Sequence, residues 1–189
     1  MPARRRLPRS SILLCVAAVA IAGACVSSAP VIDLPNLGGL DAGSRYADSV
    51  ISLFVGGQLL DCSASLPDCD AGVPQTGVCG GNPALGPPDG RLLSLGAGDS
   101  VALGFTCTGY VTAHADAGDL AVYGTLGDGG AAYAVVEVSD DGNAFEPLGI
   151  LDGGSPQTFS LSTVPTDRAR YVRLTGAGAG VAIDAVQAL

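Results

Sequence analysis

The sequence predicts an all-β fold, an antiparallel β-sandwich of the jelly-roll type. From residue 49 onward, short runs that are apolar or that alternate between apolar and polar residues follow one another. Clusters of Gly, Asp and Pro separate the runs, and none of the runs keeps the spacing of an amphipathic helix. About eight strands joined by turns at short intervals are typical of two packed antiparallel sheets.

Two of the runs indicate which strand face should be buried. In one, Val101, Leu103 and Phe105 fall on the same face, and in another Val172 and Leu174 oppose their neighbours. The stretch SDDGNAF contains Asp-Gly, the usual signal of a hairpin turn. The predicted strands are SVISLFV (49–55), SVALGFTC (100–107), YVTAHA (110–115), DLAVYG (119–124), YAVVEVS (133–139), TFSLSTV (158–164), RYVRLTG (170–176) and VAIDAVQAL (181–189).

Residues 56–90 interrupt this rhythm. They hold three cysteines and most of the mid-chain prolines, so we expect a long loop pinned by disulfides. A chain of this length can be served by one hydrophobic core, and we expect a single domain over residues 46–189.

The N-terminal stretch predicts an export signal over residues 1–24. Four arginines precede the uncharged apolar run ILLCVAAVAIAGA, which is too short for a comfortable membrane span. The small residues AGA fit a cleavage site, and Cys25 directly after them resembles the acylated cysteine of bacterial lipoproteins, although alanine stands at Ala22 where leucine is usual. We expect a cell-envelope lipoprotein with residues 25–45 as a tether. Free secretion is the alternative.

The charge balance is strongly acidic. The chain has a net charge of −9, and without the four arginines of the signal five basic residues face eighteen acidic ones, a net charge of −13. This excludes nucleic acid and anionic membrane surfaces as partners, because both require a density of cations that is missing here. The acidic residues could instead hold divalent cations, or they could simply keep the exported protein soluble.

The cysteines agree with export. Four of them lie beyond the signal, at Cys62, Cys69, Cys79 and Cys107, an even number in an oxidising compartment. Zinc does not explain them, because the chain has a single histidine and the spacings are not those of a zinc ribbon. Four cysteines allow three pairings, of which we predict Cys62 with Cys69 and Cys79 with Cys107.

Catalysis finds little support in the sequence, and we expect no enzymatic activity. The single histidine, His114, stands in an alanine-rich run, no serine lies in a GxSxG motif, and there is no lysine to replace the histidine as a base. Most aspartates lie in Asp-Gly turns, and Glu137 and Glu146 flank one hairpin rather than a cleft.

Several stretches together resemble a known group of domains. In order, YADSVISL, NPALGPPDG, LLSLGAGDSVALGF, GDLAVYG, VVEVSDDGNAFEPLG, ARYVRLTG and IDAVQAL follow the pattern of bacterial cell-surface proteins with galactose-binding-like, discoidin-type jelly rolls, over residues 46–189. This resemblance implies a surface β-sandwich in a fold group that commonly binds carbohydrate and often carries a structural calcium. Gly124 and Gly176 depart from it, because they stand where the pattern has acidic residues.

The same resemblance implies a candidate calcium site. Asp89 in NPALGPPDG matches the aspartate of a loop that supplies calcium ligands in such domains, and Asp184 is its candidate partner in the last strand. Calcium takes six to eight oxygen ligands, which a proline-stiffened loop can present as carbonyls. The alternative is a plain turn, with Asp184 paired to Arg173 or capping a backbone amide.

Two functions remain open. The first is a non-catalytic module that binds a glycan or surface polymer, and the second is a structural envelope lipoprotein without a small-molecule ligand. Tryptophan is absent, so any aromatic platform for a sugar must use Tyr46, Tyr110, Tyr123, Tyr133 or Tyr171. An exposed tyrosine beside acidic groups at one end of the sandwich would favour binding, and tyrosines all buried in the core would favour the structural role.

Overall fold

The computed structural model describes most of the chain beyond the predicted signal and tether. The described residues are 45–70, 74–80, 82–114, 118–127, 131–153 and 155–189. The predicted signal (1–24), Cys25 and the tether (25–45, except Arg45) lie outside them. Within the described ranges, no helix has the length and apolar character needed to cross a bilayer.

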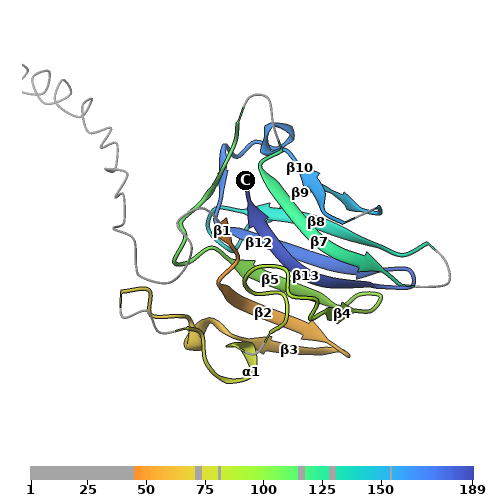
Figure 1. Ribbon diagram of the computed structural model, residues 1–189, viewed down its shortest axis with the longest axis horizontal. Coiled ribbons are helices and arrows are strands. Elements are labelled where there is room, and N and C mark those ends of the chain that lie inside the picture. The colour runs from red at the N-terminus through yellow and green to blue at the C-terminus, as the bar shows by residue number, and fades with distance from the viewer. Residues whose placement is uncertain (1–44, 71–73, 81, 115–117, 128–130, 154) are drawn as a thin grey trace, which may run out of the picture. The chain divides into compact units, whose positions relative to one another are not determined.

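The described residues form an antiparallel β-sandwich, which confirms the predicted fold class at that level (Figure 1). One sheet has the strand order β3-β2-β5-β12-β8-β9, and all of its ladders are antiparallel. Its strands are β2 (Ser49–Val55), β3 (Gln58–Asp61), β5 (Ser100–Gly104), β8 (Tyr133–Ser139), β9 (Glu146–Leu151) and β12 (Tyr171–Ala177).

The second sheet has the order β1-β13-β7-β10, with β4 also paired to β13. Its strands are β1 (Arg45–Tyr46), β4 (Leu93–Leu95), β7 (Leu120–Leu126), β10 (Gln157–Phe159) and β13 (Val181–Ala188). Beside the two sheets lie a short ribbon of β6 (Val111–Thr112) and β11 (Arg168–Ala169), and the helical turns η1 (Ser63–Ser65), α1 (Gly77–Gly80) and η2 (Leu161–Thr163).

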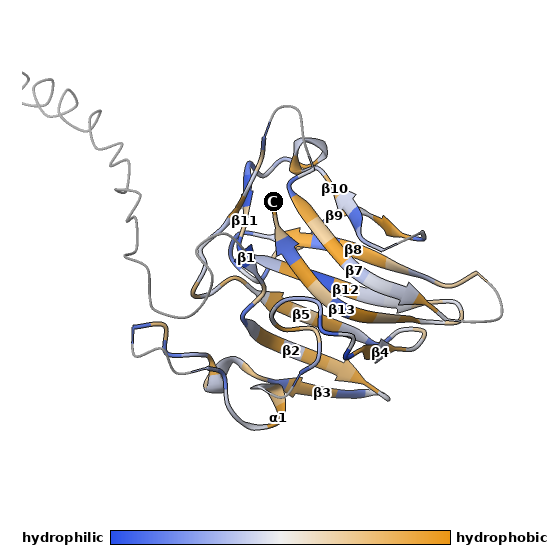
Figure 2. Ribbon diagram, in the orientation of Figure 1, coloured by the Kyte–Doolittle hydropathy of each residue, from blue (hydrophilic) through white to orange (hydrophobic). Residues whose placement is uncertain are grey.

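The core is formed by buried apolar side chains from both sheets. Figure 2 shows hydrophobic residues along the strands of both sheets. In β12, Val172 and Leu174 have no exposed surface, whereas Tyr171 and Arg173 on the opposite face are half-buried. Side chains from β5 and β8 join this cluster from one sheet, and side chains from β7 and β13 join it from the other. Burial of apolar area at roughly 25 cal/mol per Å² drives the two sheets together.

Two of the predicted strands have the predicted bounds. SVISLFV and YAVVEVS coincide with β2 and β8. The run TFSLSTV differs, because β10 ends at Phe159 and η2 follows. The hydroxyl of Ser160 accepts a hydrogen bond from the N–H of Ser162, which caps this helical turn and ends the strand. The strand β9 was not predicted, because its sequence EPLGIL contains proline and glycine and it forms an edge of its sheet.

The predicted hairpin at Asp141-Gly142 joins β8 to β9. Gly142 has φ = 76°, a left-handed conformation that glycine adopts without strain. The Asp141 carboxylate accepts backbone N–H bonds from Asn143 and Ala144 and a hydroxyl bond from Ser139, and these donors lower its pKa to about 2.

The segment 56–90 holds β3, η1 and α1, and its disulfides differ from the predicted pairing. Cys62 pairs with Cys79 and Cys69 pairs with Cys107, so the prediction of Cys62 with Cys69 and Cys79 with Cys107 was wrong. The physical reason is the buried side chain of Gln75. Its amide exchanges two hydrogen bonds of 2.7 Å with the backbone of Val50 and also donates to the carbonyl of Cys62, which draws the neighbouring α1 toward Cys62.

The other disulfide reaches Cys107 in a turn that Asp48 anchors. The Asp48 carboxylate accepts N–H bonds from Thr106, Cys107 and Thr108 at 2.9, 2.7 and 3.1 Å. These hydrogen bonds fix the backbone of the turn directly after β5, and the disulfide joins Cys69 to Cys107 in this turn.

Gly124 and Gly176, the two departures from the family pattern, lie where backbones approach closely. A Cβ on Gly176 would lie 2.5 Å from the carbonyl oxygen of Gly96, and a Cβ on Gly124 would lie 2.8 Å from that of Ala182. No side chain fits at either position without a shift of the backbone, so neither can carry the acidic residue of the pattern.

Candidate functional site

The candidate site is built around Tyr110, and the β6–β11 ribbon assembles it. The register pairs Thr112 with Arg168 and Val111 with Ala169, and Tyr110 and Arg170 each adjoin this short ladder in sequence. The guanidinium carbons of Arg168 and Arg170 lie 4.7 and 5.2 Å from the centre of the Tyr110 ring, which is the geometry of cation–π contacts. We call Tyr110, Asp140, Arg168 and Arg170 the Tyr110 site.

The two arginines of the Tyr110 site differ in their partners. Arg168 donates from Nε and Nη2 to one oxygen of Asp140, at 3.2 and 3.0 Å, and this hydrogen bonding raises the pKa of Arg168. Arg170 pairs with no carboxylate in the described part of the chain, and its Nε is buried without a hydrogen-bond partner. A buried donor that no acceptor satisfies is rare in folded proteins.

Tyr110 was predicted from the sequence as an aromatic candidate, whereas neither arginine was. The stretch Arg168-Ala169-Arg170 carries a usable signal, because alternate residues of a strand face the same side and Ala169 is fully buried. Of the five tyrosines, all are half-buried and none belongs to the fully buried core. Neither arrangement expected from the sequence is met in full, because Tyr110 is half-buried rather than exposed and its ring contacts arginines rather than acidic groups.

The predicted pair Asp89 and Asp184 does come together. Asp184 lies at a β-bulge in β13, and its carboxylate accepts N–H bonds from Asp89 at 3.1 Å and from Gly90 at 3.2 Å. The other predicted partner, Arg173, instead donates two bonds of 2.7 Å to Glu137, so an Asp184–Arg173 pair is ruled out. Asp184 anchors the Pro-Pro loop through its backbone.

This donor set fits an anchored loop better than a calcium cage. Both oxygens of Asp184 already accept amide N–H groups, and Asp89 accepts the N–H of Arg91 at 2.9 Å. Among the residues that the structure describes, no group of three or more His, Cys, Asp or Glu gathers as a metal site would require. Calcium takes six to eight oxygens, of which two carboxylates are a small share. Calcium at this site stays a prediction.

A calcium titration distinguishes a calcium site from a loop that Asp184 only anchors. If Asp89 and Asp184 share an ion, calcium added to the chelated protein raises its melting temperature, because the ion binds only the folded form. At a hundredfold excess over Kd, the free energy of unfolding rises by about 2.7 kcal/mol. Asp89→Ala and Asp184→Ala then each abolish the shift, and magnesium substitutes poorly. If Asp184 serves only as an anchor, calcium shifts nothing and Asp184→Ala destabilises equally with and without the ion.

His114 belongs to a hydrogen-bond cluster that lacks the order of a hydrolytic triad. Asp119, which has no exposed surface, accepts from the N–H and ring Nδ1 of His114 through one oxygen and from the hydroxyl of Ser160 through the other. A triad needs the imidazole between serine and carboxylate, so that it can take the proton of the hydroxyl. Here the carboxylate lies in the middle, and the cluster ties loops together.

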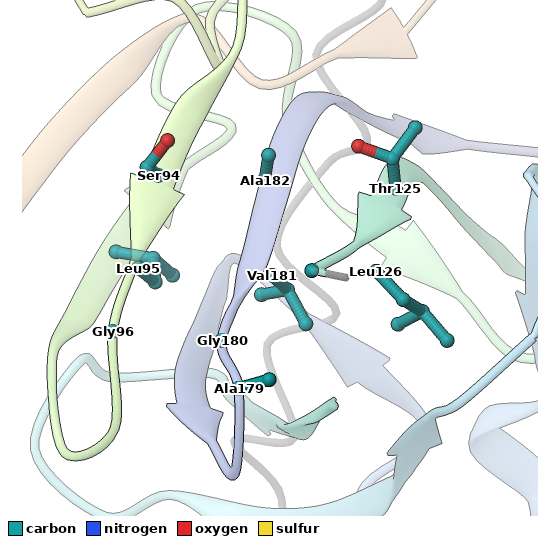
Figure 3. Close-up of a pocket in the computed structure, with 10 residues that line it drawn as sticks. Ser94, Leu95, Gly96, Thr125, Leu126, Ala179, Gly180, Val181 and Ala182 are labelled. Atoms are coloured by element: carbon teal, nitrogen blue, oxygen red, sulfur yellow. The ribbon is translucent and has the colours of Figure 1, made fainter. Parts of the chain in front are cut away.

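A shallow depression lies where the ends of β4, β7 and β13 meet (Figure 3). Its volume is about 290 Å³, and its walls include Leu95, Leu126 and Val181, with hydroxyls from Ser94 and Thr125. No charged side chain lines it. With so few polar groups to orient a ligand, it is a weaker candidate than the Tyr110 site.

No family model matches the chain, and no curated protein matches it. Among solved structures, the chain is similar to the CBM32 of AlyQ in complex with 4,5-unsaturated mannuronic acid, with a TM-score of 0.37 and 17% sequence identity. The match covers 53% of this chain and 81% of that chain.

Proposed function

We propose that this protein is a non-catalytic binding module for a glycan or surface polymer, and that the Tyr110 site makes the contact. The observation that carries the proposal is Arg170, whose guanidinium lies against Tyr110 and has no carboxylate partner among the residues that the structure describes. Sugars present many hydroxyl oxygens, and guanidinium N–H groups in a fixed fork are suited to bind them. The Tyr110 ring holds both arginines in place for that purpose.

A glycan array tests this function. We expect wild-type protein to bind one or more glycans, and Tyr110→Ala to weaken that binding about tenfold, because both arginines lose the ring that orients them. Tyr133→Ala is the matched control, since Tyr133 is also half-buried and lies at the start of β8, outside the Tyr110 site.

Two results would contradict the proposal. If no glycan binds the folded wild-type protein, the structural envelope role is favoured. If Tyr110→Ala and Tyr133→Ala bind as well as wild type, the contact lies elsewhere on the molecule.

Export and lipid anchoring complete the proposed function. We expect an acylated Cys25 to hold the protein in the cell envelope, with binding at the far end of the tether. Cys25→Ser should move the protein from the detergent phase to the aqueous phase, because the substituted side chain cannot carry the diacylglycerol. An unchanged partition between the phases would contradict the lipoprotein hypothesis and favour the alternative, in which the protein is freely secreted.

A further inference from the structure

The arginines of the described residues differ in whether a carboxylate neutralises their charge, and this difference indicates which ligand the protein binds. Arg173 pairs with Glu137, and Arg168 pairs with Asp140. Among the described side chains, the Tyr110 ring is the one partner of the Arg170 guanidinium. In a chain with no lysine and twice as many acidic as basic residues, a half-buried arginine without a counter-ion is unexpected.

A partly desolvated guanidinium without a counter-charge is unfavourable in the folded protein. Burial removes water from the charge, and an aromatic face returns only part of what hydration supplied. A carboxylate offsets the rest, because its two oxygens match the planar fork of guanidinium N–H groups and charge-assisted bonds are about twice as strong as neutral ones. The missing partner of Arg170 is therefore an anion.

From this geometry we infer that the ligand is an acidic sugar, one of whose carboxylates binds Arg170. The inference rests on the proposed glycan-binding function and names its ligand class. One carboxylate is the number that fits, because Asp140 already neutralises Arg168. The net charge of −13 beyond the signal arginines opposes a dense polyanion, so the anionic group belongs to a single residue in an otherwise neutral oligosaccharide.

The test compares a glucuronic-acid-terminated oligosaccharide with its methyl ester, which keeps the shape and removes the charge. We expect wild-type protein to bind the acid at least tenfold more tightly than the ester by calorimetry. Arg170→Gln should abolish this preference and leave the melting temperature nearly unchanged, because the lost ring contact with Tyr110 is offset by removal of a partly buried charge without a counter-ion among the described residues. Arg91→Gln, which removes the same charge from an exposed position before β4, should keep the preference.

Each other outcome is decisive. If wild-type protein binds acid and ester equally and Tyr110→Ala weakens both, the acidic-sugar inference is wrong and the glycan-binding function stands. If Arg91→Gln loses the preference as Arg170→Gln does, net charge rather than a site explains it, and the inference is wrong. If no glycan of any kind binds, the proposed function fails and the inference fails with it.

Discussion

Replacing Cys69 and Cys107 together by serine is expected to lower the free energy of unfolding by about 4 kcal/mol. In the chain-entropy model a disulfide stabilises by restricting the unfolded chain, and the effect grows with the enclosed length. The Cys69–Cys107 disulfide spans 38 residues, whereas Cys62–Cys79 spans 17. For the shorter loop the same model predicts a stabilisation of about 3 kcal/mol. For a domain of this size, 4 kcal/mol lowers Tm by roughly 10 °C in a thermal melt.

Peptide mapping checks the connectivity on which this ranking depends. Cleavage on the amino side of aspartate separates all four cysteines, because Asp68 and Asp70 flank Cys69 and Asp99 precedes Cys107. Without reduction, we expect the Cys62 peptide to be linked to the Cys79 peptide. A Cys62–Cys69 linkage would restore the pairing predicted from the sequence, and free thiols in the unfolded protein would exclude two disulfides altogether.

The second large effect is expected at Asp119. Its buried carboxylate accepts N–H bonds of 2.7 Å from both His114 and Leu161, so Asp119→Ala leaves buried donors without an acceptor. Each such donor costs about 1 to 3 kcal/mol, and we expect a total loss of about 4 kcal/mol. Chemical denaturation measures this loss. Asp152→Ala, which removes an exposed carboxylate, is the control and should change stability by less than about 0.5 kcal/mol.

The same residue predicts a dependence on pH. Burial raises the pKa of Asp119, but the N–H donors of Leu161 and His114 and the hydroxyl of Ser160 outweigh burial and leave the pKa below its usual value. A carboxyl whose folded pKa is lowered contributes stability above its unfolded pKa of about 4, and this contribution is lost as the pH falls through the folded pKa. Wild-type protein should therefore lose stability below pH 4.

Asp119→Asn separates this effect from general acid unfolding. The amide cannot ionise, so the stability of this variant should fall less steeply below pH 4 than that of wild type. Asp141 contributes to the remaining slope, because its pKa is also lowered, to about 2. Equal slopes for wild type and Asp119→Asn would show that Asp119 does not ionise at the expected pH.

By itself, the sequence determined the fold class and the position of several strands. In the run that became β12, apolar residues alternate with polar ones, and this local pattern decides which face is buried. The Asp-Gly hairpin at Asp141 was also readable, because the geometry of a tight turn depends on two adjacent residues.

Only the tertiary structure decided which distant residues meet. The disulfide partners follow from the place of Gln75 against β2, and the partner of Asp184 follows from a bulge in β13. Arg168 pairs with Asp140 and Arg173 pairs with Glu137, and only these pairings show that Arg170 has no carboxylate partner among the described residues. Such contacts depend on strand register and on the packing of two sheets, which join residues far apart in the chain, so no local pattern encodes them.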